Sequence, residues 1–233
     1  MIKVTSTANA QTTEHALAGA TGSPAPGSPV RRTRMSRAAR CEQLLDVAEE
    51  LFCANGFEGT SIEDVAKAAG VTRPVVYAHY SDKDELFVAC VRRARAEVEE
   101  SLGEFEALIR AGASIATVIH RAGTIFFTTL ERNPRRWMVL FNPSTALSED
   151  LDKRLNALRR QTIQQIASVT RHVLPDDEAR STAFAYAISG VGEQIGRWWL
   201  DNPEIPRDDA ITHYREFIER GLGISRPLHI KAP

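Results

Sequence analysis

Cysteine is scarce in this chain of 233 residues, and the three cysteines, Cys41, Cys53 and Cys90, form no CxxC pair. The six histidines are scattered singly along the sequence. Structural zinc sites need closely spaced ligands, and disulfide frameworks need paired cysteines. The sequence therefore favours neither. We predict no metal ion and no cofactor, and the cysteine usage fits a reducing cytoplasm.

Long apolar runs and an excess of one charge are also missing. No run approaches the length of about 20 apolar residues that a membrane-spanning helix needs, and the start of the chain lacks the layout of a secretory signal. Lysine and arginine number 29 against 30 acidic residues, so the formal net charge is -1. This balance excludes a globally basic nucleic-acid binder but allows a local basic patch. We predict a soluble cytoplasmic protein without membrane contact.

Catalytic motifs are absent as well. The sequence contains no HExxH or ExxH spacing, no phosphate loop and no nucleophile elbow. Glu193 beside Gln194, in a segment of small residues, comes nearest to a buried polar site, and we interpret it as structural. We therefore predict that the protein is not an enzyme. A helical-bundle enzyme remains a remote alternative.

The two ends of the chain differ in composition from the rest. Residues 1–30 are rich in Ala, Thr, Ser, Gly and Pro and predict a disordered leader, and residues 225–233 are expected to form a flexible tail. A basic arm reaching to about residue 36 follows the leader, and the segment from 31 to 40 contains five arginines: Arg31, Arg32, Arg34, Arg37 and Arg40. A solvated arm and an arm that contacts phosphate both fit this pattern.

Between these ends, apolar residues recur at helical spacing, and no segment alternates as a strand does. We therefore predict an all-α fold. Its N-terminal domain, residues 37–97, contains three helices with a helix-turn-helix, and a larger helical domain covers 98–224. Beyond the long helix that begins near Asp82, the pattern predicts four helices: 114–132, 148–174, 177–200 and 208–221.

Residues 61–80 combine two short helices with a glycine-containing turn. Ser61 and Asp64 form a capping box at the start of the first helix, Gly70 ends it, and Thr72 caps the second. Two short helices joined by such a turn form the helix-turn-helix, whose second helix lies in a DNA major groove. The segment therefore predicts a DNA-binding unit.

Helical spacing assigns the side chains of this second helix to two faces. Val76 and Tyr80 lie four residues apart and are expected to point inward. Arg73 can offer a bidentate fork to guanine, Val75 can meet a thymine methyl group, and Pro74 offers a flat apolar contact. Four residues can reach phosphate oxygens and fix register: Thr72, Tyr77, His79 and Lys83.

One known family shares this pattern. Its spacing in this chain is Phe57-Glu58-Gly59-Thr60-Ser61-Ile62-x-x-Val65-Ala66-x-x-Ala69-Gly70-Val71-Thr72-Arg73-x-x-Val76-Tyr77-x-His79-Tyr80-x-x-Lys83-x-x-Leu86. It resembles the DNA-binding domain of TetR-family transcriptional regulators, over about residues 37–97. Pro74-Val75 departs from the small or glycine residue that is commoner there, which affects base preference. The resemblance implies DNA contacts from Ser61, Thr72, Arg73, Pro74, Val75, Tyr77, His79 and Lys83.

The resemblance also implies partners and a regulatory mode. It implies a bacterial homodimer that pairs through helices 177–200 and 208–221 and binds a palindromic double-stranded DNA operator, associating with the nucleoid when bound. The expected function is a repressor released by a small-molecule effector. A body that binds a protein partner and no small ligand is the alternative. Four residues are weak predictions for the effector pocket: His120, Phe127, Trp137 and Phe141.

Overall fold

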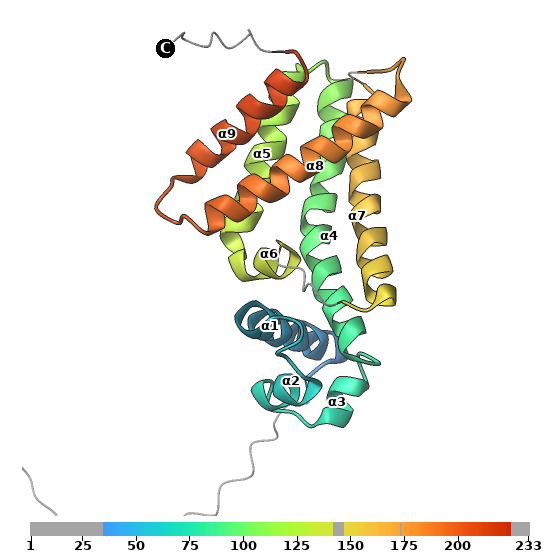
Figure 1. The fold of residues 1–233 in the computed structure, drawn as a ribbon, viewed down its shortest axis with the longest axis vertical. Helices are drawn as coiled ribbons and strands as arrows, with labels where there is room; N and C mark the ends of the chain where they lie inside the picture. The colour runs from blue at the N-terminus through green and yellow to red at the C-terminus, as the bar shows by residue number, and fades with distance from the viewer. Residues whose placement is uncertain (1–34, 142–146, 173, 225–233) are drawn as a thin grey trace, which may run out of the picture. The chain divides into compact units, whose positions relative to one another are not determined.

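The computed structural model describes residues 35–141, 147–172 and 174–224, and this part of the chain is helical without strands (Figure 1). The predicted all-α fold is therefore confirmed. The predicted leader, three arginines of the basic arm (Arg31, Arg32 and Arg34) and the predicted tail lie outside the described residues.

Three helices form the N-terminal bundle: α1 (Arg37–Asn55), α2 (Ile62–Ala68) and α3 (Arg73–Tyr77). Gly56 ends α1 with φ at 73°, the left-handed region where glycine is favoured. The capping box of Ser61 and Asp64 at the start of α2 is present. Gly70, with φ at 65°, makes the turn between α2 and α3.

Helix α4 (Lys83–Arg110) connects this bundle to the body and runs along the body beside α7 (Figure 1). The Asp82 carboxylate caps α4 by accepting the N–H of Glu85 at 2.7 Å, and this bond holds the pKa of Asp82 below its usual value. The expected domain boundary between residues 97 and 98 falls inside α4. The two parts of the chain therefore share one continuous helix, which can transmit movement between them.

The body is completed by five helices: α5 (Ile115–Arg132), α6 (Pro134–Phe141), α7 (Glu149–Thr170), α8 (Glu178–Leu200) and α9 (Arg207–Gly221). Helix α6 was not among the helices expected from the sequence. Helix α7 ends at Thr170, earlier than the predicted residue 174. The helical conformation is disfavoured at Leu174 because Pro175 follows it, so the helix ends before that point.

Two apolar cores hold these helices. The first joins α1, α2 and α3 to the start of α4, and Leu44, Val65 and Leu86 are fully buried in it. The second lies between α5, α6, α8 and α9, around Phe127 and Leu130. Ring contacts join Phe127 to Trp199 and to Tyr214, with centroids 5.6 and 6.0 Å apart.

Two glycines of α8, Gly192 and Gly196, pack inside the subunit. The helix was expected to pair with a second subunit, and small residues such as these would suit a close approach of that subunit. A Cβ atom at Gly196 would instead lie 2.8 Å from Leu130 Cδ2 and 3.3 Å from ring atoms of Phe126 and Phe141, and Gly192 faces Tyr214. For these two glycines the close approach is therefore the contact of α8 with α5, α6 and α9, which corrects the sequence-based interpretation.

Candidate nucleic-acid interface and effector cavity

Helix α3 presents one face to the core and the other to solvent. Val76 and Tyr80 are buried, as predicted. The exposed side contains Thr72, Arg73, Pro74 and Tyr77, and the Tyr77 side chain is 52% exposed although it is a large aromatic. Val75 is half-buried. A five-residue helix that leaves a tyrosine, an arginine and a proline in solvent has the surface chemistry of a recognition helix.

Arg73 makes an ion pair with Glu63 of α2, and both side chains are 59% exposed. Sequence reasoning did not anticipate this pair. An exposed ion pair contributes only about 0 to 1 kcal/mol, so a guanine edge can compete for the guanidinium. Thr72 occupies the N-cap position of α3, but its side chain makes no capping hydrogen bond, so its hydroxyl stays available for another acceptor.

His79 lies between α3 and the start of α1. Its Nδ1 is 3.5 Å from Cys41 Sγ. Partial burial, followed by the positive charges of Arg37 and Arg40, lowers the pKa of His79 below its usual value, so the free protein holds a neutral imidazole at neutral pH. Arg37 also donates to the Ala78 carbonyl at 3.4 Å. The structure thus places Arg37 and Arg40, at the start of α1, close to the end of α3.

The side chains of Lys83 and Ser61 already form hydrogen bonds within the protein. The Lys83 ammonium donates to the Phe57 carbonyl at 2.9 Å and lies 4.1 Å from the centroid of the Phe57 ring. The Ser61 hydroxyl donates to the Asp64 carboxylate at 2.6 Å and accepts the Asp64 N–H. A phosphate contact from either side chain has to compete with these bonds, so their DNA roles stay predictions that the geometry favours less than those of Thr72 and Tyr77.

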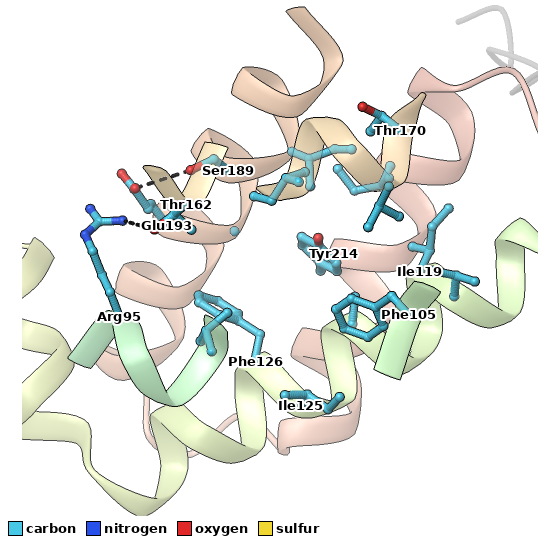
Figure 2. A pocket seen from close by; sticks show the side chains of 18 of the residues that line it. Arg95, Phe105, Ile119, Ile125, Phe126, Thr162, Thr170, Ser189, Glu193 and Tyr214 are labelled. Atoms are coloured by element: carbon cyan, nitrogen blue, oxygen red, sulfur yellow. Dashed lines mark hydrogen bonds between the residues drawn. The ribbon is translucent and has the colours of Figure 1, made fainter. Parts of the chain in front are cut away.

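The body encloses an apolar cavity of about 150 Å³ (Figure 2). Its walls come from α4, α5, α6, α7, α8 and α9 and are mostly aliphatic and aromatic, with Phe105, Ile119 and Phe126 among them. Arg95, Thr162 and Glu193 supply polar groups at one end, and Figure 2 shows Tyr214 across the cavity from them. An apolar cavity with few polar groups is typical of a small-molecule site.

Two of the four residues predicted for the effector pocket, Trp137 and Phe141, line cavities of the body. Trp137 lines the apolar cavity. His120 is exposed on the outer side of α5, and Phe127 is fully buried among Phe126, Trp199 and Tyr214, without facing the cavity. Phe141 lines neighbouring cavities instead. Helical spacing alone cannot separate these cases, because the residues that do line the cavity come from six helices.

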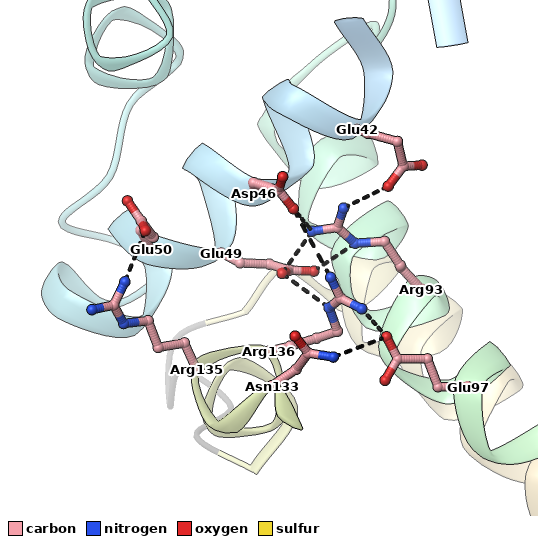
Figure 3. Close-up of polar contacts among 9 residues, drawn as sticks. All are labelled: Glu42, Asp46, Glu49, Glu50, Arg93, Glu97, Asn133, Arg135 and Arg136. Atoms are coloured by element: carbon pink, nitrogen blue, oxygen red, sulfur yellow. Dashed lines mark hydrogen bonds and ion pairs between the residues drawn. The ribbon is translucent and has the colours of Figure 1, made fainter. Parts of the chain in front are cut away.

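A network of charged side chains joins the DNA-binding bundle to the body (Figure 3). The Glu49 carboxylate of α1 is 7% exposed and pairs with Arg93 of α4 at 2.6 Å and with Arg136 of α6 at 3.1 Å. Arg136 also pairs with Glu97 of α4. Burial by itself lowers the pKa of Arg93, but the bond to Glu49 and the charges of Glu49 and Asp46 raise it overall. Movement of α4 or α6 therefore has to displace these bonds or carry α1 along.

Two searches of the described residues, 35–141, 147–172 and 174–224, gave negative findings. They contain no group of three or more His, Cys, Asp or Glu side chains arranged to hold a metal ion. No helix among them is long and apolar enough to cross a membrane.

Two family models match the chain. The model of bacterial regulatory proteins of the tetR family matches residues 44–90, and that of the tetracyclin repressor-like C-terminal domain matches residues 115–221. The HTH-type transcriptional activator FasR of Mycolicibacterium smegmatis is 24% identical over 197 residues, which cover 84% of this chain and 89% of FasR.

Solved structures agree with the family models. A TetR-like transcriptional regulator from Rhodococcus sp. RHA1 is 27% identical, with a TM-score of 0.65 over 82% of this chain and 99% of the other. The regulator FadR of Bacillus subtilis, solved in complex with stearoyl-CoA, shares the fold at 14% identity, with a TM-score of 0.65 over 79% of this chain and 99% of FadR. With both domain models matched in chain order around the helix-turn-helix described above, the chain belongs to the TetR family of DNA-binding transcriptional regulators.

Proposed function

We propose that the protein is a homodimeric repressor that binds a palindromic operator and is released from it by a small-molecule effector. The observation that carries the proposal is the exposed face of α3, where Thr72, Arg73, Pro74 and Tyr77 lie in solvent above a buried Val76. The role is regulatory and not enzymatic, and its site of action is the bacterial cytoplasm, on the nucleoid when bound.

Each exposed residue of α3 has a separate role in the proposal. Arg73 leaves Glu63 and reads a guanine edge, while Pro74 and Val75 make apolar contacts with base edges. The hydroxyls of Thr72 and Tyr77 and the imidazole of His79 bind phosphate oxygens and set the register of the helix on the duplex. Arg37 and Arg40 add positive charge beside the same phosphates, which favours the DNA-contacting interpretation of the basic arm.

Dimerisation is proposed through the exposed face of α8 and α9. Three large side chains lie there in solvent: Tyr186 at 52% exposure, Trp198 at 41% and Phe217 at 60%. Exposed aromatics are enriched in interfaces between subunits. Two copies paired through this face would present two recognition helices, which a palindromic operator accepts at a spacing of about 34 to 36 Å or a multiple of it.

The apolar cavity supports a small-molecule effector over the alternative of a purely protein-binding body. FadR, which shares the fold, was solved with stearoyl-CoA, and a small molecule is the effector class proposed for this chain too. Trp137 lines the cavity and its neighbour Arg136 binds Glu49 of α1, so a ligand that shifts α6 or tilts α4 acts on the DNA-binding bundle. Effector binding and DNA release are then linked as reciprocal free energies.

Repression and activation need a separate test, because the similar protein FasR is named an activator. A repressor lowers transcription from a promoter that overlaps its operator. We expect a reporter placed behind that promoter to be less active when this protein is present. Higher reporter activity would contradict repression while leaving DNA binding intact.

The DNA-binding assignment is tested with two variants of α3. Duplexes selected from a random library by the wild-type protein supply the operator for gel-shift measurements. We expect Arg73→Ala to weaken operator binding by about 1 to 3 kcal/mol and to relax one base position. Tyr77→Phe removes one phosphate contact and should weaken binding to all duplexes alike.

Arg160→Ala is the matched control, because Arg160 is an exposed arginine of α7 far along the chain from α3. Its operator affinity should equal that of the wild type. Unchanged affinity in both Arg73→Ala and Tyr77→Phe would reject the assignment of α3 as the recognition helix.

A further inference from the structure

A second cavity adjoins the apolar one. It measures about 400 Å³, and Arg95, Leu140 and Glu193 line both cavities. The two differ in chemistry, because the first is almost entirely apolar, whereas polar side chains line much of the second: Asp152, Asn156, Arg159, Gln194 and Arg197. Arg95 and Glu193 therefore stand where an apolar space meets a polar one.

Arg95 has unused hydrogen-bonding capacity at this junction. Its Nη1 donates to Thr162 Oγ1 at 3.1 Å, whereas its Nε is buried and has no hydrogen-bond partner among the described residues. No carboxylate of the described chain forms an ion pair with Arg95, although Arg93 and Arg136 both pair with Glu49. A guanidinium always carries its charge in proteins, and a buried donor without a partner is costly. Arg95 thus offers charge and donors to a ligand.

The second cavity carries a net positive charge. Three arginines line it, Arg95, Arg159 and Arg197, against two acids, Asp152 and Glu193. Glu193 is engaged by Arg159 at 2.6 Å, and Asp152 accepts the Asn156 amide at 2.8 Å. No ion pair or hydrogen bond of the Arg197 side chain is present within the described part of the chain. An anionic group bound there would find two arginines without carboxylate partners.

The first cavity is suited to the opposite chemistry. Valine, isoleucine, leucine and aromatic side chains make up most of its wall, and Figure 2 shows Phe105 and Ile119 away from the charged end. The Tyr214 hydroxyl has no hydrogen-bond partner among the described residues, and burial raises its pKa. Burying apolar ligand surface there is favourable by roughly 25 cal/mol per Å².

We propose that the two cavities form one bipartite site for an amphipathic anion. Its elongated apolar body lies in the first cavity, and its anionic head group binds Arg95 and extends toward Arg159 and Arg197 in the second. The inference rests on the proposed function in one respect, namely that this ligand is the effector. The chemical class of the ligand follows from the side chains that meet at Arg95.

Direct titration of the full-length protein with four probes of one chain length tests the site. Laurate and lauryl phosphate carry anionic heads, lauryl alcohol a neutral head and lauryltrimethylammonium a cationic one. We expect calorimetry below the micelle concentrations to detect the two anions, with the alcohol and the cation at least about tenfold weaker, because charged hydrogen bonds contribute about 1.5 to 3 kcal/mol. Equal binding of all four probes, or no binding of any, would overturn the proposal.

Variants locate the head group. Arg95→Gln should weaken both anions by about tenfold or more and leave the affinity for lauryl alcohol unchanged. Arg92→Gln is the matched control, because Arg92 is an exposed arginine of the same helix, and it should change nothing. Circular dichroism melting of each variant verifies folding. An Arg95→Gln protein that melts like the wild type and binds the anions equally well would reject the site.

A larger polyanionic head tests the second cavity. Lauroyl-coenzyme A should bind at least as tightly as laurate, and Arg197→Gln should weaken the coenzyme A thioester more than laurate. Equal effects on both would restrict the site to Arg95 and reject the second half of the proposal.

Operator binding, measured in parallel, separates this proposal from the proposed function. Anion binding without any change in operator affinity would keep the site and reject its effector role. Operator binding that some other small molecule releases, in a protein that binds none of the anions, would reject the site and leave the regulator intact.

Discussion

At the residue scale, the proposed phosphate contact of His79 would make DNA binding depend on pH. In the free protein, partial burial and the charges of Arg37 and Arg40 lower its pKa below the usual 6.5. If its free ring nitrogen binds a phosphate, DNA stabilises the imidazolium and raises that pKa, so binding takes up a proton. We predict that operator affinity rises as pH falls from about 7.5 to 6, by less than about tenfold per pH unit because one proton is involved.

The free energy of unfolding of the free protein should change with pH in the opposite direction, because the contribution of His79 falls as pH falls. Its folded-state pKa is depressed, so the unfolded chain binds the proton first as pH falls. The contribution is present above the unfolded value of 6.5 and is lost as pH falls through the folded value. In the His79→Gln variant, the part of the pH dependence that His79 contributes should vanish from both the operator affinity and the free energy of unfolding. An operator affinity of the wild type as flat with pH as that of the variant would contradict the phosphate contact.

The orientation of α3 side chains could be predicted from the sequence, whereas their bonding partners could not. The four-residue spacing of the apolar Val76 and Tyr80 predicted that both point inward, and Arg73 and Tyr77 were assigned to the exposed side, which is where the structure has them. The Arg73 to Glu63 pair depends on how α2 and α3 pack. The bond from Lys83 to the Phe57 carbonyl joins residues 26 positions apart. Such contacts are set by tertiary packing, which no local pattern contains.

Among the elements, α1, α4 and α6 share an ionic contact at Glu49. Its buried carboxylate is shared by Arg93 and Arg136, whose side chains are 13% and 14% exposed. Removing one partner of a buried ion pair costs about 3 to 5 kcal/mol when the other charge is left uncompensated. Arg93 keeps its pairs with Glu42 and Asp46, and Arg136 keeps Glu97, so the cost here should stay below that full value. We predict that Glu49→Gln lowers the free energy of unfolding toward that size, measured by urea denaturation.

Glu50→Gln is the matched control for this network. Glu50 is the next residue of α1 and also reaches α6, through Arg135 at 2.8 Å, but both side chains are more than 60% exposed. An exposed pair contributes about 0 to 1 kcal/mol, so this variant should unfold almost like the wild type. Equal destabilisation by the two substitutions would show that burial of Glu49 does not determine its contribution.

At this scale the sequence predicted every described helix except α6. Helix α4 starts at Asp82, its N-cap, near the predicted position, and α5 ends at the predicted residue, Arg132. Pro134, two residues after the end of α5, begins the eight-residue helix α6, because proline is accepted in the first turn of a helix. The lining of the apolar cavity could not be predicted in full, since it depends on the packing of six helices.

For the whole molecule, the proposed dimer would determine how tightly the protein holds its operator. Tyr186 and Trp198 on α8 and Phe217 on α9 stay exposed in one subunit. If a second copy covers them, two recognition helices bind one operator with the avidity of a linked pair, which amounts to about 10² to 10⁴ over a single subunit. The surface that sets this avidity is remote in sequence from the surface that reads DNA.

We predict that Phe217→Glu dissociates the dimer and weakens operator binding by about a hundredfold or more, because it places an unpaired charge at the centre of an apolar contact. Analytical ultracentrifugation measures the oligomeric state, and gel shifts measure the affinity.

Ala157→Glu is the control for the change in net charge, because it adds the same charge at an exposed position of α7. It should leave both the oligomeric state and the operator affinity unchanged. A Phe217→Glu protein that sediments as a dimer would move the interface away from this face. A wild type that sediments as a monomer and still binds the palindrome tightly would remove the need for a dimer.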